Sequence, residues 1–376
     1  MSVVGIIFSN IHDKNVPDLT KSRTMASVPF GCRYRLIDFT LSNMVHSGIN
    51  HVGVITHYNY QSLMDHLGSG KDWDLARRAG GIQILPPYIT AFANPQNFLY
   101  STRLEALKNI ISFISGCTED YVVLCDCDVI SNIDLNEIID YHIASHADAT
   151  MMIKRMYLTS ENANHVQTVK SNDDGRLTAV TEYTGRESGF SDINTNIWVM
   201  SRRFLESIVT EAIAYNYNSF IQDIVQKNIG VYNFRIYRHE SYFATIDSMQ
   251  TYYICSMDLL NERVRHGLFN VPGRPILTKV RNSPPTVYAE GADVRNSLVA
   301  DGCIINGTVE NSVLFRGVTV GRNTVIKNSI LMQDTIVGDN VNLHAVITDK
   351  NAVIRDGRTL SGHETLPFYI GKFTQI

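Results

Sequence analysis

Residues 3–39 read VVGIIFSNIHDKNVPDLTKSRTMASVPFGCRYRLIDF, and this stretch decides how the fold begins. Its first six residues, Val3 to Phe8, form a continuous apolar run that is typical of a strand buried on both faces. Residues 9–15 follow; they contain no glycine and include Asp13. Backbone N–H groups can cradle a phosphate only where side chains are absent and positive φ is allowed. We therefore expect residues 9–15 to form an ordinary surface loop after an edge of the sheet, unable to hold a triphosphate.

Short β-rich runs alternate with amphipathic helical patterns up to about residue 260. Residues 52–56 and 121–124 predict buried strands, whereas residues 104–114 and 135–145 predict helices. This alternation indicates βαβ units, and hence a mixed, mostly parallel sheet covered by helices. Ligands of such sheets bind beyond the carboxyl ends of the strands, so chemistry is expected in the segments that follow these strands.

The sequence becomes self-similar after the proline pair at residues 284–285. Asn-Ser-aliphatic triplets recur at 296–298, 311–313 and 328–330, and aliphatic residues fall six positions apart at 320, 326 and 332. This is the hexapeptide spacing of a parallel β-helix with three short strands per coil. The chain is therefore expected to comprise an α/β domain of residues 1–260, a linker of residues 261–286 and a left-handed parallel β-helix of residues 287–376, serving architecture and assembly.

The bulk composition is that of a water-soluble globular protein. Of the 376 residues, 44% are hydrophobic and 19% charged, and the net charge of −4 with no basic run argues against nucleic acid as a partner. No apolar run approaches the length of a membrane span, and the start lacks the features of a secretory signal, so a cytoplasmic location is expected. Six cysteines without Cys-x-x-Cys spacing favour buried reduced thiols.

The run RTMASVPFGCRYRLIDF at residues 23–39 resembles the RAKPAVPFGGxYRIIDF signature of the bacterial glucose-1-phosphate adenylyltransferases (ADP-glucose pyrophosphorylases). The resemblance extends over nearly the whole chain, for example to NSVLFRG at residues 311–317. It implies a Rossmann-like, GT-A-like nucleotidyltransferase domain followed by the β-helix. Enzymes of this family join ATP and glucose 1-phosphate to give ADP-glucose and diphosphate, with Mg²⁺ held by two carboxylates.

Several functional positions of the family are retained. The resemblance places Asp128 as the first magnesium carboxylate and Arg23 among the catalytic residues, and it leaves Glu182 and Arg33 as candidate substrate-binding residues. A second interpretation of the arginines is a salt-bridge set with Asp38 and neighbouring carboxylates that holds the signature loop.

Other positions have lost their chemistry. The glycine loop is absent, the lysine of the signature is Met25, and the sugar-phosphate lysine is Tyr183. The second magnesium carboxylate aligns with Tyr242, so a site left with one carboxylate is expected to bind Mg²⁺ poorly. Each loss of a transition-state charge contact typically costs roughly 10²–10³ in rate, so this chain alone is expected to have little or no activity.

Within the family the chain resembles the GlgD-type subunits, which occur beside a catalytic GlgC-type subunit. This implies a regulatory, catalytically degenerate subunit of a heteromeric glucose-1-phosphate adenylyltransferase in glycogen biosynthesis. We expect a hetero-oligomer, a tetramer by analogy, with self-association through the β-helix and a sugar-phosphate or nucleotide effector as further expectations. Mg²⁺ is expected in the holoenzyme and not on this chain. Two alternatives stay open: a self-sufficient sugar-phosphate nucleotidyltransferase with an altered site, and a non-reacting sugar-phosphate sensor.

Overall fold

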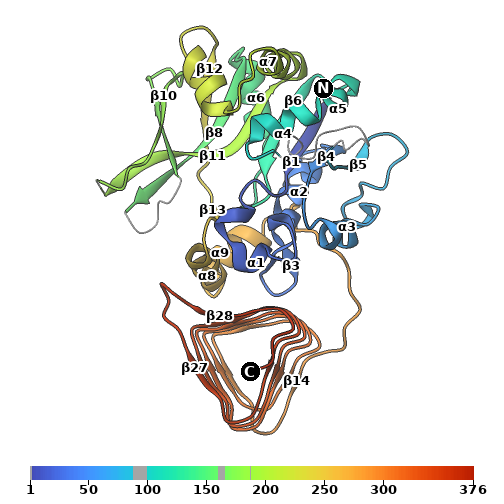
Figure 1. Cartoon of the computed structure of the whole chain (residues 1–376), viewed down its shortest axis with the longest axis vertical. Coiled ribbons are helices and arrows are strands. Elements are labelled where there is room, and N and C mark those ends of the chain that lie inside the picture. The colour runs from blue at the N-terminus through green and yellow to red at the C-terminus, as the bar shows by residue number, and fades with distance from the viewer. Residues whose placement is uncertain (1, 88–99, 160–165, 187) are drawn as a thin grey trace.

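The computed structural model describes residues 2–87, 100–159, 166–186 and 188–376. An α/β domain occupies the N-terminal part, and a triangular β-helix lies against one end of it (Figure 1). Within the described ranges, no helix combines the length and apolar character needed to cross a bilayer.

The α/β domain is built on a nine-stranded sheet in which the first strand of the chain is central. The strand order is β10-β9-β11-β6-β1-β4-β5, with β8 pairing β11 and β12. Strands β6, β1, β4 and β5 run parallel, whereas β11 runs antiparallel to β6. The strands span Val3–Phe8 (β1), His51–Ile55 (β4), Gly81–Leu85 (β5), Tyr121–Asp126 (β6), Ala149–Leu158 (β8), Gln167–Ser171 (β9), Leu177–Glu182 (β10), Gly189–Ser201 (β11) and Phe234–Arg238 (β12). Short pairs join Pro29–Phe30 (β2) to Tyr34–Arg35 (β3), and Val129–Ile130 (β7) to Ala244–Thr245 (β13).

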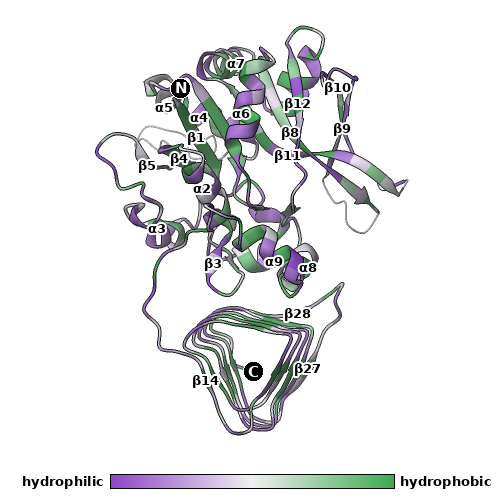
Figure 2. Ribbon diagram, turned by 180° about the vertical axis from the view of Figure 1, so that it is seen from behind, coloured by the Kyte–Doolittle hydropathy of each residue, from purple (hydrophilic) through white to green (hydrophobic). Residues whose placement is uncertain are grey.

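Helices cover both faces of this sheet, which explains the continuous apolar run in β1. Ile6 belongs to one buried cluster and Ile7 to the other, because successive side chains of a strand point to opposite faces. The hydrophobic colouring of Figure 2 is strong along these central strands. The helices are Pro17–Thr20 (α1), Leu36–His46 (α2), Gln61–Leu67 (α3), Arg103–Asn109 (α4), Ile111–Gly116 (α5), Leu135–Ala144 (α6), Arg202–Ala214 (α7), Met249–Asp258 (α8) and Glu262–Phe269 (α9), with a π-helical segment at Phe220–Gln226.

The mostly parallel sheet and the helix predicted at 135–145 are confirmed, and two details differ. The helix predicted over 104–114 is interrupted at Ile110, which ends α4 and precedes α5. The expected linker begins with a helix: α9 buries Leu268 in the core, so the extended connection starts only at residue 270. The segment of α9 therefore belongs to the packed α/β domain and not to the extended linker.

The β-helix consists of three five-stranded parallel sheets stacked around a triangular core. One sheet holds Val287–Tyr288 (β14), Ile304–Ile305 (β17), Thr319–Val320 (β20), Ile336–Val337 (β23) and Val353–Ile354 (β26). A second holds Asp293–Arg295 (β15), Thr308–Glu310 (β18), Val325–Lys327 (β21), Asn342–His344 (β24) and Thr359–Ser361 (β27). The third holds Leu298–Val299 (β16), Val313–Leu314 (β19), Ile330–Leu331 (β22), Val346–Thr348 (β25) and Phe368–Ile370 (β28).

The Asn-Ser repeats build one corner of this prism. The asparagines of the three triplets all have positive φ, between 40° and 48°, which asparagine tolerates better than most residues. The following serines form a ladder in which Ser312 N–H donates to Ser297 Oγ and Ser329 N–H donates to Ser312 Oγ. The repeat spacing therefore reflects corners stacked in register, which confirms the predicted left-handed β-helix.

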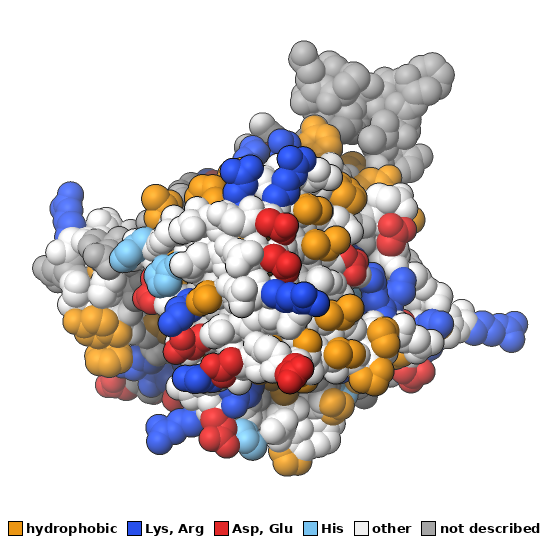
Figure 3. Space-filling model, turned by 90° about the horizontal axis from the view of Figure 1, so that it is seen from below, with side chains coloured by type: hydrophobic (Ala, Val, Ile, Leu, Met, Phe, Trp, Pro, Cys, Tyr) orange, Lys and Arg blue, Asp and Glu red, His pale blue; other side chains and the backbone are white. Residues whose placement is uncertain are grey.

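The third sheet of the β-helix packs against the α/β domain. Val313, Ile330 and Ile347 belong to the same buried cluster as residues of α2 and α8. The interface also contains a buried ion pair, in which Arg23 Nη2 donates to both carboxylate oxygens of Asp349 at 2.8 and 2.9 Å. Figure 3 looks onto the β-helix end of the molecule and shows acidic, basic and apolar side chains interspersed, without a field of one sign.

Candidate functional site

The segments that follow β1 and β6 meet at the carboxyl edge of the central strands. Cys127 N–H donates to the carbonyl of Phe8, and the buried Ser9 and Asn10 continue from β1. The expectation of an ordinary loop at a sheet edge is therefore wrong, because β1 lies between β6 and β4 and its loop begins inside the protein. The loop is placed where a ligand of such a sheet would lie, even though it lacks glycine.

Two carboxylates at this edge are neutralised by side chains of the chain itself. His12 Nδ1 lies 2.5 Å from Asp128 Oδ2, and the Arg103 guanidinium donates to both carboxylate oxygens of Asp126. Arg103 Nη2 also lies 3.1 Å from His12 Nε2, so the four groups form one cluster.

The electrostatics of this cluster favour its paired state. Burial acts to lower the pKa of His12, but Asp128 and Asp126 outweigh it and hold that pKa above its usual value. For Asp128, burial acts to raise the pKa, while the charges of His12 and Arg103 bring it below its usual value. His12 and Asp128 are therefore each charged more readily than in water, and their opposite charges compensate each other.

A small pocket of about 90 Å³ opens beside the cluster. It is lined by side chains from both halves of the α/β domain: His12, Asn15, Arg103, Asp128, Val166, Gln167, Ile193, Asn194, Asn196, Thr245 and Asp247. Asp247 faces Asp128 across it; burial raises the pKa of Asp247, hydrogen bonds from Thr251 and Ser248 oppose this, and the charge of Asp128 adds to the rise.

The position expected to hold the second magnesium carboxylate is not in the pocket. Tyr242 is turned away, and its hydroxyl donates to Asp258 Oδ2 at 3.2 Å. Thr245 lines the pocket instead, because β13 pairs it with Val129 and so brings it beside Asp128. Tyr242, which the resemblance matched to the second magnesium carboxylate, therefore lies outside the pocket, whereas Thr245 and Asp247 of the same segment line it.

The carboxylates of the charge cluster are already engaged by side chains that compete with Mg²⁺. Three potential ligands, on His12, Asp126 and Asp128, lie within 4.8 Å of one another, but Arg103 occupies Asp126 and His12 occupies one oxygen of Asp128. Asp128 Oδ1 is buried and has no hydrogen-bond partner within the described ranges, and Asp247, the other carboxylate that lines the pocket, accepts from the Thr251 hydroxyl. Mg²⁺ prefers several oxygen ligands in near-octahedral geometry, so it would have to displace His12 and Arg103 from the cluster carboxylates.

The lysine position of the signature has become part of the core. Met25 is fully buried in the cluster that joins the two domains, and its N–H donates to Asp13 Oδ1 at 2.7 Å. Burial raises the pKa of Asp13 to about 7, and the hydrogen bond from Met25 together with the nearby His12 only partly opposes this. A cation at position 25 could not reach a phosphate without disrupting this packing.

The remaining predicted site residues do not converge on the pocket. Arg23 is 2% exposed and paired with Asp349 in the domain interface, so its partner lies in the β-helix and is not Asp38. Arg33 is half exposed and lies 3.4 Å from Asp301, also in the β-helix. Glu182 ends β10 with an exposed side chain. Only Asp128 of the predicted set lines the pocket.

A second cluster of charge lies between the domains. Its cavity is lined by Pro29, Cys32, Arg33, Tyr34, Arg35, His66, Lys279, Arg281, Phe315, Arg316, Gln333 and Lys350, which include six Lys and Arg side chains. Burial and the neighbouring arginines lower the pKa of Lys350 to about 7, and burial lowers the pKa of Arg35 to about 10. Burial is the largest cause of both shifts, and neighbouring positive charges add to them.

An α/β sheet with its pocket at the carboxyl edge, followed by a hexapeptide β-helix, defines a nucleotidyltransferase with a C-terminal left-handed β-helix. The nucleotidyl transferase family model matches residues 14–238, and the GlmU-like C-terminal hexapeptide model matches residues 286–365. The chain belongs to the nucleotidyl transferase family, and within it to the group that contains the glucose-1-phosphate adenylyltransferases and GlgD.

Three curated relatives define that group. The glycogen biosynthesis protein GlgD of Bacillus subtilis (strain 168) is 33% identical over 98% of this chain and 96% of its own length. The glucose-1-phosphate adenylyltransferase of Pseudothermotoga lettingae is 32% identical, covering 86% of this chain and 76% of its own. The enzyme of the same name from Bacillus subtilis is 31% identical, covering 86% and 84%.

Proposed function

We propose that this chain is a regulatory, non-catalytic subunit that acts in glycogen biosynthesis together with a catalytic glucose-1-phosphate adenylyltransferase subunit. The observation that carries the proposal is the closed charge cluster at the carboxyl edge of the sheet. His12 and Arg103 supply, from within the chain, the positive charge that Mg²⁺ would bring to Asp128 and Asp126.

The charge balance of the expected reaction explains why this cluster opposes catalysis. Attack of a sugar phosphate on a nucleotide triphosphate brings several negative charges together, and an enzyme stabilises them with a metal ion and cationic side chains. In this chain the two internal cations are already satisfied by carboxylates, and the position of the signature lysine is an apolar core position. The pocket retains a shape for binding without the charges for turnover.

The cationic cavity between the domains supports a regulatory role. It is bounded by the retained half of the signature run, through Arg33 and Arg35, and by Arg316 and Lys350 of the β-helix. The cavity measures about 30 Å³, so the phosphate group of a sugar phosphate or a nucleotide, and not the whole ligand, would contact both domains there at once. A ligand that touches both domains can bias how they sit, and so can bias a partner packed on them, provided its contacts differ between two states.

The β-helix offers a surface for the partner. Its first sheet presents Val287, Ile304 and Ile336 outward in register, and these side chains are about half exposed. Thr319 occupies the same position on the coil between Ile304 and Ile336. A mainly aliphatic row on stacked coils suits a second surface with the same spacing, such as the β-helix of a related subunit. We therefore propose a hetero-oligomer with the catalytic subunit, with a tetramer as the expected assembly and self-association of this chain as its counterpart.

The test compares three samples with ATP, glucose 1-phosphate and Mg²⁺: this chain alone, a catalytic subunit from the same genome alone, and the two mixed. The proposal expects no enzyme-like turnover from this chain, and it expects the mixture to differ from the catalytic subunit in rate or in effector response. Substantial turnover by this chain alone would refute the non-catalytic part. A mixture that behaves as the sum of its parts, without co-elution in gel filtration, would refute the regulatory part.

A further inference from the structure

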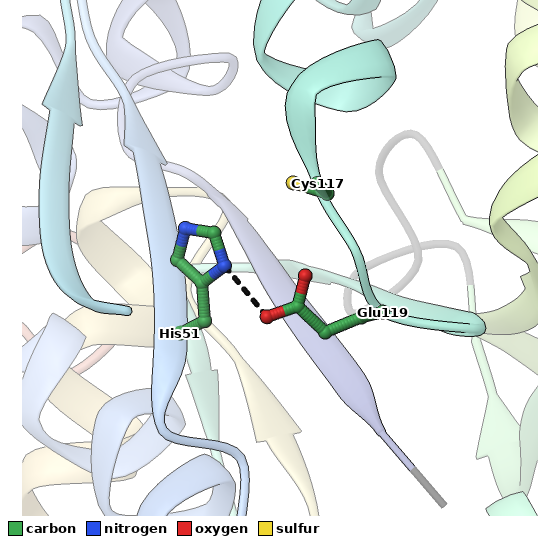
Figure 4. A group of neighbouring side chains, drawn as sticks. All are labelled: His51, Cys117 and Glu119. Atoms are coloured by element: carbon green, nitrogen blue, oxygen red, sulfur yellow. Dashed lines mark hydrogen bonds and ion pairs between the residues drawn. The ribbon is translucent and has the colours of Figure 1, made fainter. Parts of the chain in front are cut away.

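A mixed set of metal-ligating side chains lies at the amino ends of the central strands, at the opposite edge of the sheet from the pocket. His51 begins β4, while Cys117 and Glu119 lie in the connection from α5 to β6 (Figure 4). One ligand atom from each of these three residues lies within 4.8 Å of the other two, and His51 Nδ1 is 2.8 Å from Glu119 Oε1. The pocket around Asp128 plays no part in this arrangement.

His51 and Glu119 are turned toward each other, whereas the Cys117 thiol donates to the carbonyl of Phe113 at 3.2 Å and would exchange that contact for the ion. The edge of the Phe113 ring packs on His51 with centroids 5.3 Å apart, and Gln83 Nε2 lies 3.4 Å from His51 Nε2. The amide nitrogen of Gln83 is a donor, so in this arrangement His51 Nε2 accepts and Nδ1 carries the proton that faces Glu119. Metal binding through Nδ1 would move the proton to Nε2, and rotation of the Gln83 amide would bring its oxygen into place to accept it, as the outer partners of metal-bound histidines do. Thr118 N–H donates to Glu119 Oε2 at 3.0 Å, which leaves Oε1 facing His51.

We propose that His51, Cys117 and Glu119 form a binding site for a divalent transition-metal ion, Zn²⁺ by its chemistry, with a fourth position open to water. A nitrogen, a sulfur and an oxygen ligand match Zn²⁺, whereas the thiolate disfavours Mg²⁺ and Ca²⁺. Tetrahedral coordination at the usual bond lengths places ligand atoms roughly 3.3–3.7 Å apart. The His51 to Glu119 contact must therefore open by somewhat more than about half an ångström, and the sulfur must approach both.

A metal ion must displace the proton of the Cys117 thiol in order to bind. Burial raises the pKa of Cys117 to about 11, the charge of Glu119 adds to this rise, and Arg202 opposes it. Arg202 is already engaged, because it donates to the carbonyl of Glu119 and pairs with Glu206. A metal ion would supply the counter-charge that the thiolate and the carboxylate share, and binding would release the thiol proton.

Occupation of this site would fasten the start of β4 to the connection that leads into β6. Because β6 ends at Asp126, the ion would stabilise the strand that carries the charge cluster. The expected readout is thermodynamic: a ligand that binds only the folded state raises the midpoint of thermal unfolding as its concentration rises.

The experiment uses the full-length chain after removal of metal with a chelator. We expect one Zn²⁺ per chain in competition with a chromophoric chelator and a Zn²⁺-dependent rise in unfolding temperature that an equal concentration of Mg²⁺ does not produce. Co²⁺ in place of Zn²⁺ should give the near-ultraviolet charge-transfer absorption of a cobalt-thiolate bond. Absence of that absorption, or no Zn²⁺ bound at stoichiometric concentration, would overturn the proposal.

Variants locate the ion. His51→Gln and Cys117→Ser should each weaken Zn²⁺ binding by more than the roughly 10- to 100-fold that loss of an outer-shell partner costs, and Gln83→Ala by about 10-fold. Cys255→Ser removes another buried thiol, in α8, and should leave Zn²⁺ affinity unchanged. Full Zn²⁺ affinity in both His51→Gln and Cys117→Ser would refute the site. If Cys117→Ser does not fold, the partly exposed His51→Gln and the cobalt spectrum of the unaltered chain decide.

Discussion

The ion pair between Arg23 and Asp349 should be a principal link between the two domains, and Asp349→Asn tests this. The carboxylate accepts two hydrogen bonds from Arg23 Nη2, one from the Tyr369 hydroxyl at 3.0 Å and one from the Lys350 N–H at 2.6 Å. Asparagine keeps the shape and one acceptor oxygen but removes the charge. Arg23, with its side chain 3% exposed, would then be a buried cation without a counter-charge.

The size of the effect follows from burial and from the neighbouring cations. Breaking one partner of a buried ion pair costs about 3–5 kcal/mol, because it leaves the other charge uncompensated in a low-dielectric site. Arg35 and Lys350 add positive charge near Arg23. The charges of Arg35 and Arg23 lower the pKa of Lys350, and the negative charge of Asp349 partly offsets this. We therefore expect Asp349→Asn to cost at least about 3 kcal/mol of unfolding free energy.

Urea unfolding followed by far-ultraviolet circular dichroism measures this loss, with the β-helix and the α/β domain allowed to unfold in separate steps. Asp293→Asn, which breaks an exposed pair with Arg295, is the matched control and should change stability far less. The double variant Arg23→Met with Asp349→Leu should recover most of the loss, because it leaves no unpaired charge. An Asp349→Asn variant no less stable than Asp293→Asn would refute the assigned role of Arg23.

Three further predictions concern the signature run and the two charge clusters. Met25→Lys should lower the unfolding free energy by about 3 kcal/mol or more, since it buries an ammonium in the core, while Met25→Leu should cost less than about 1.5 kcal/mol; equal urea midpoints for the two would contradict this. The pKa of Asp13 is about 7 in the folded chain, against 3.8 for a free aspartate, so the folded chain loses stability as the pH rises from about 4 to 7. Asp13→Asn should therefore raise the midpoint of thermal unfolding at pH 8 but not near pH 4. Lys350 has a pKa of about 7, so it carries more positive charge at pH 6 than at pH 9, and sulfate should stabilise the chain more at pH 6 at equal ionic strength. If a Lys350→Met variant keeps this difference in stabilisation, Lys350 is not its source.

Periodicity was sufficient to predict the architecture. The run at residues 3–8 is apolar at every position because β1 lies in the middle of a covered sheet, and the Asn-Ser triplets mark corners whose side chains bond to the coil above or below. Both signals are local, so the sequence displays them directly. The domain border was predicted less well, because the pattern of α9 depends on the core that receives Leu268.

The candidate site was predictable only in part, because its partners come from distant segments. Asp128 could be placed after a strand, but His12 reaches it from 116 residues away and no motif marked that contact. Arg103 likewise reaches Asp126 from the start of α4, 23 residues earlier in the chain. Thr245 and Asp247 line the pocket and Tyr242 does not, because the pairing of β13 with β7 sets which residues of this segment lie beside Asp128; sequence similarity over a few residues does not resolve this.

The position of the arginines changes the meaning of the retained signature. Arg23 pairs with Asp349, Arg33 approaches Asp301, and Arg35 lines the interdomain cavity, so all three serve the contact with the β-helix. The glycine loop and the lysine served only phosphate chemistry, and both were replaced by groups that pack or pair internally, as Met25 and His12 do. A chain that must assemble and respond to an anion would keep the three arginines, and it could lose the glycine loop and the lysine. The division of the signature thus follows the border between the domain interface and the pocket at the carboxyl edge of the sheet, and it argues that the interface is what this chain preserves.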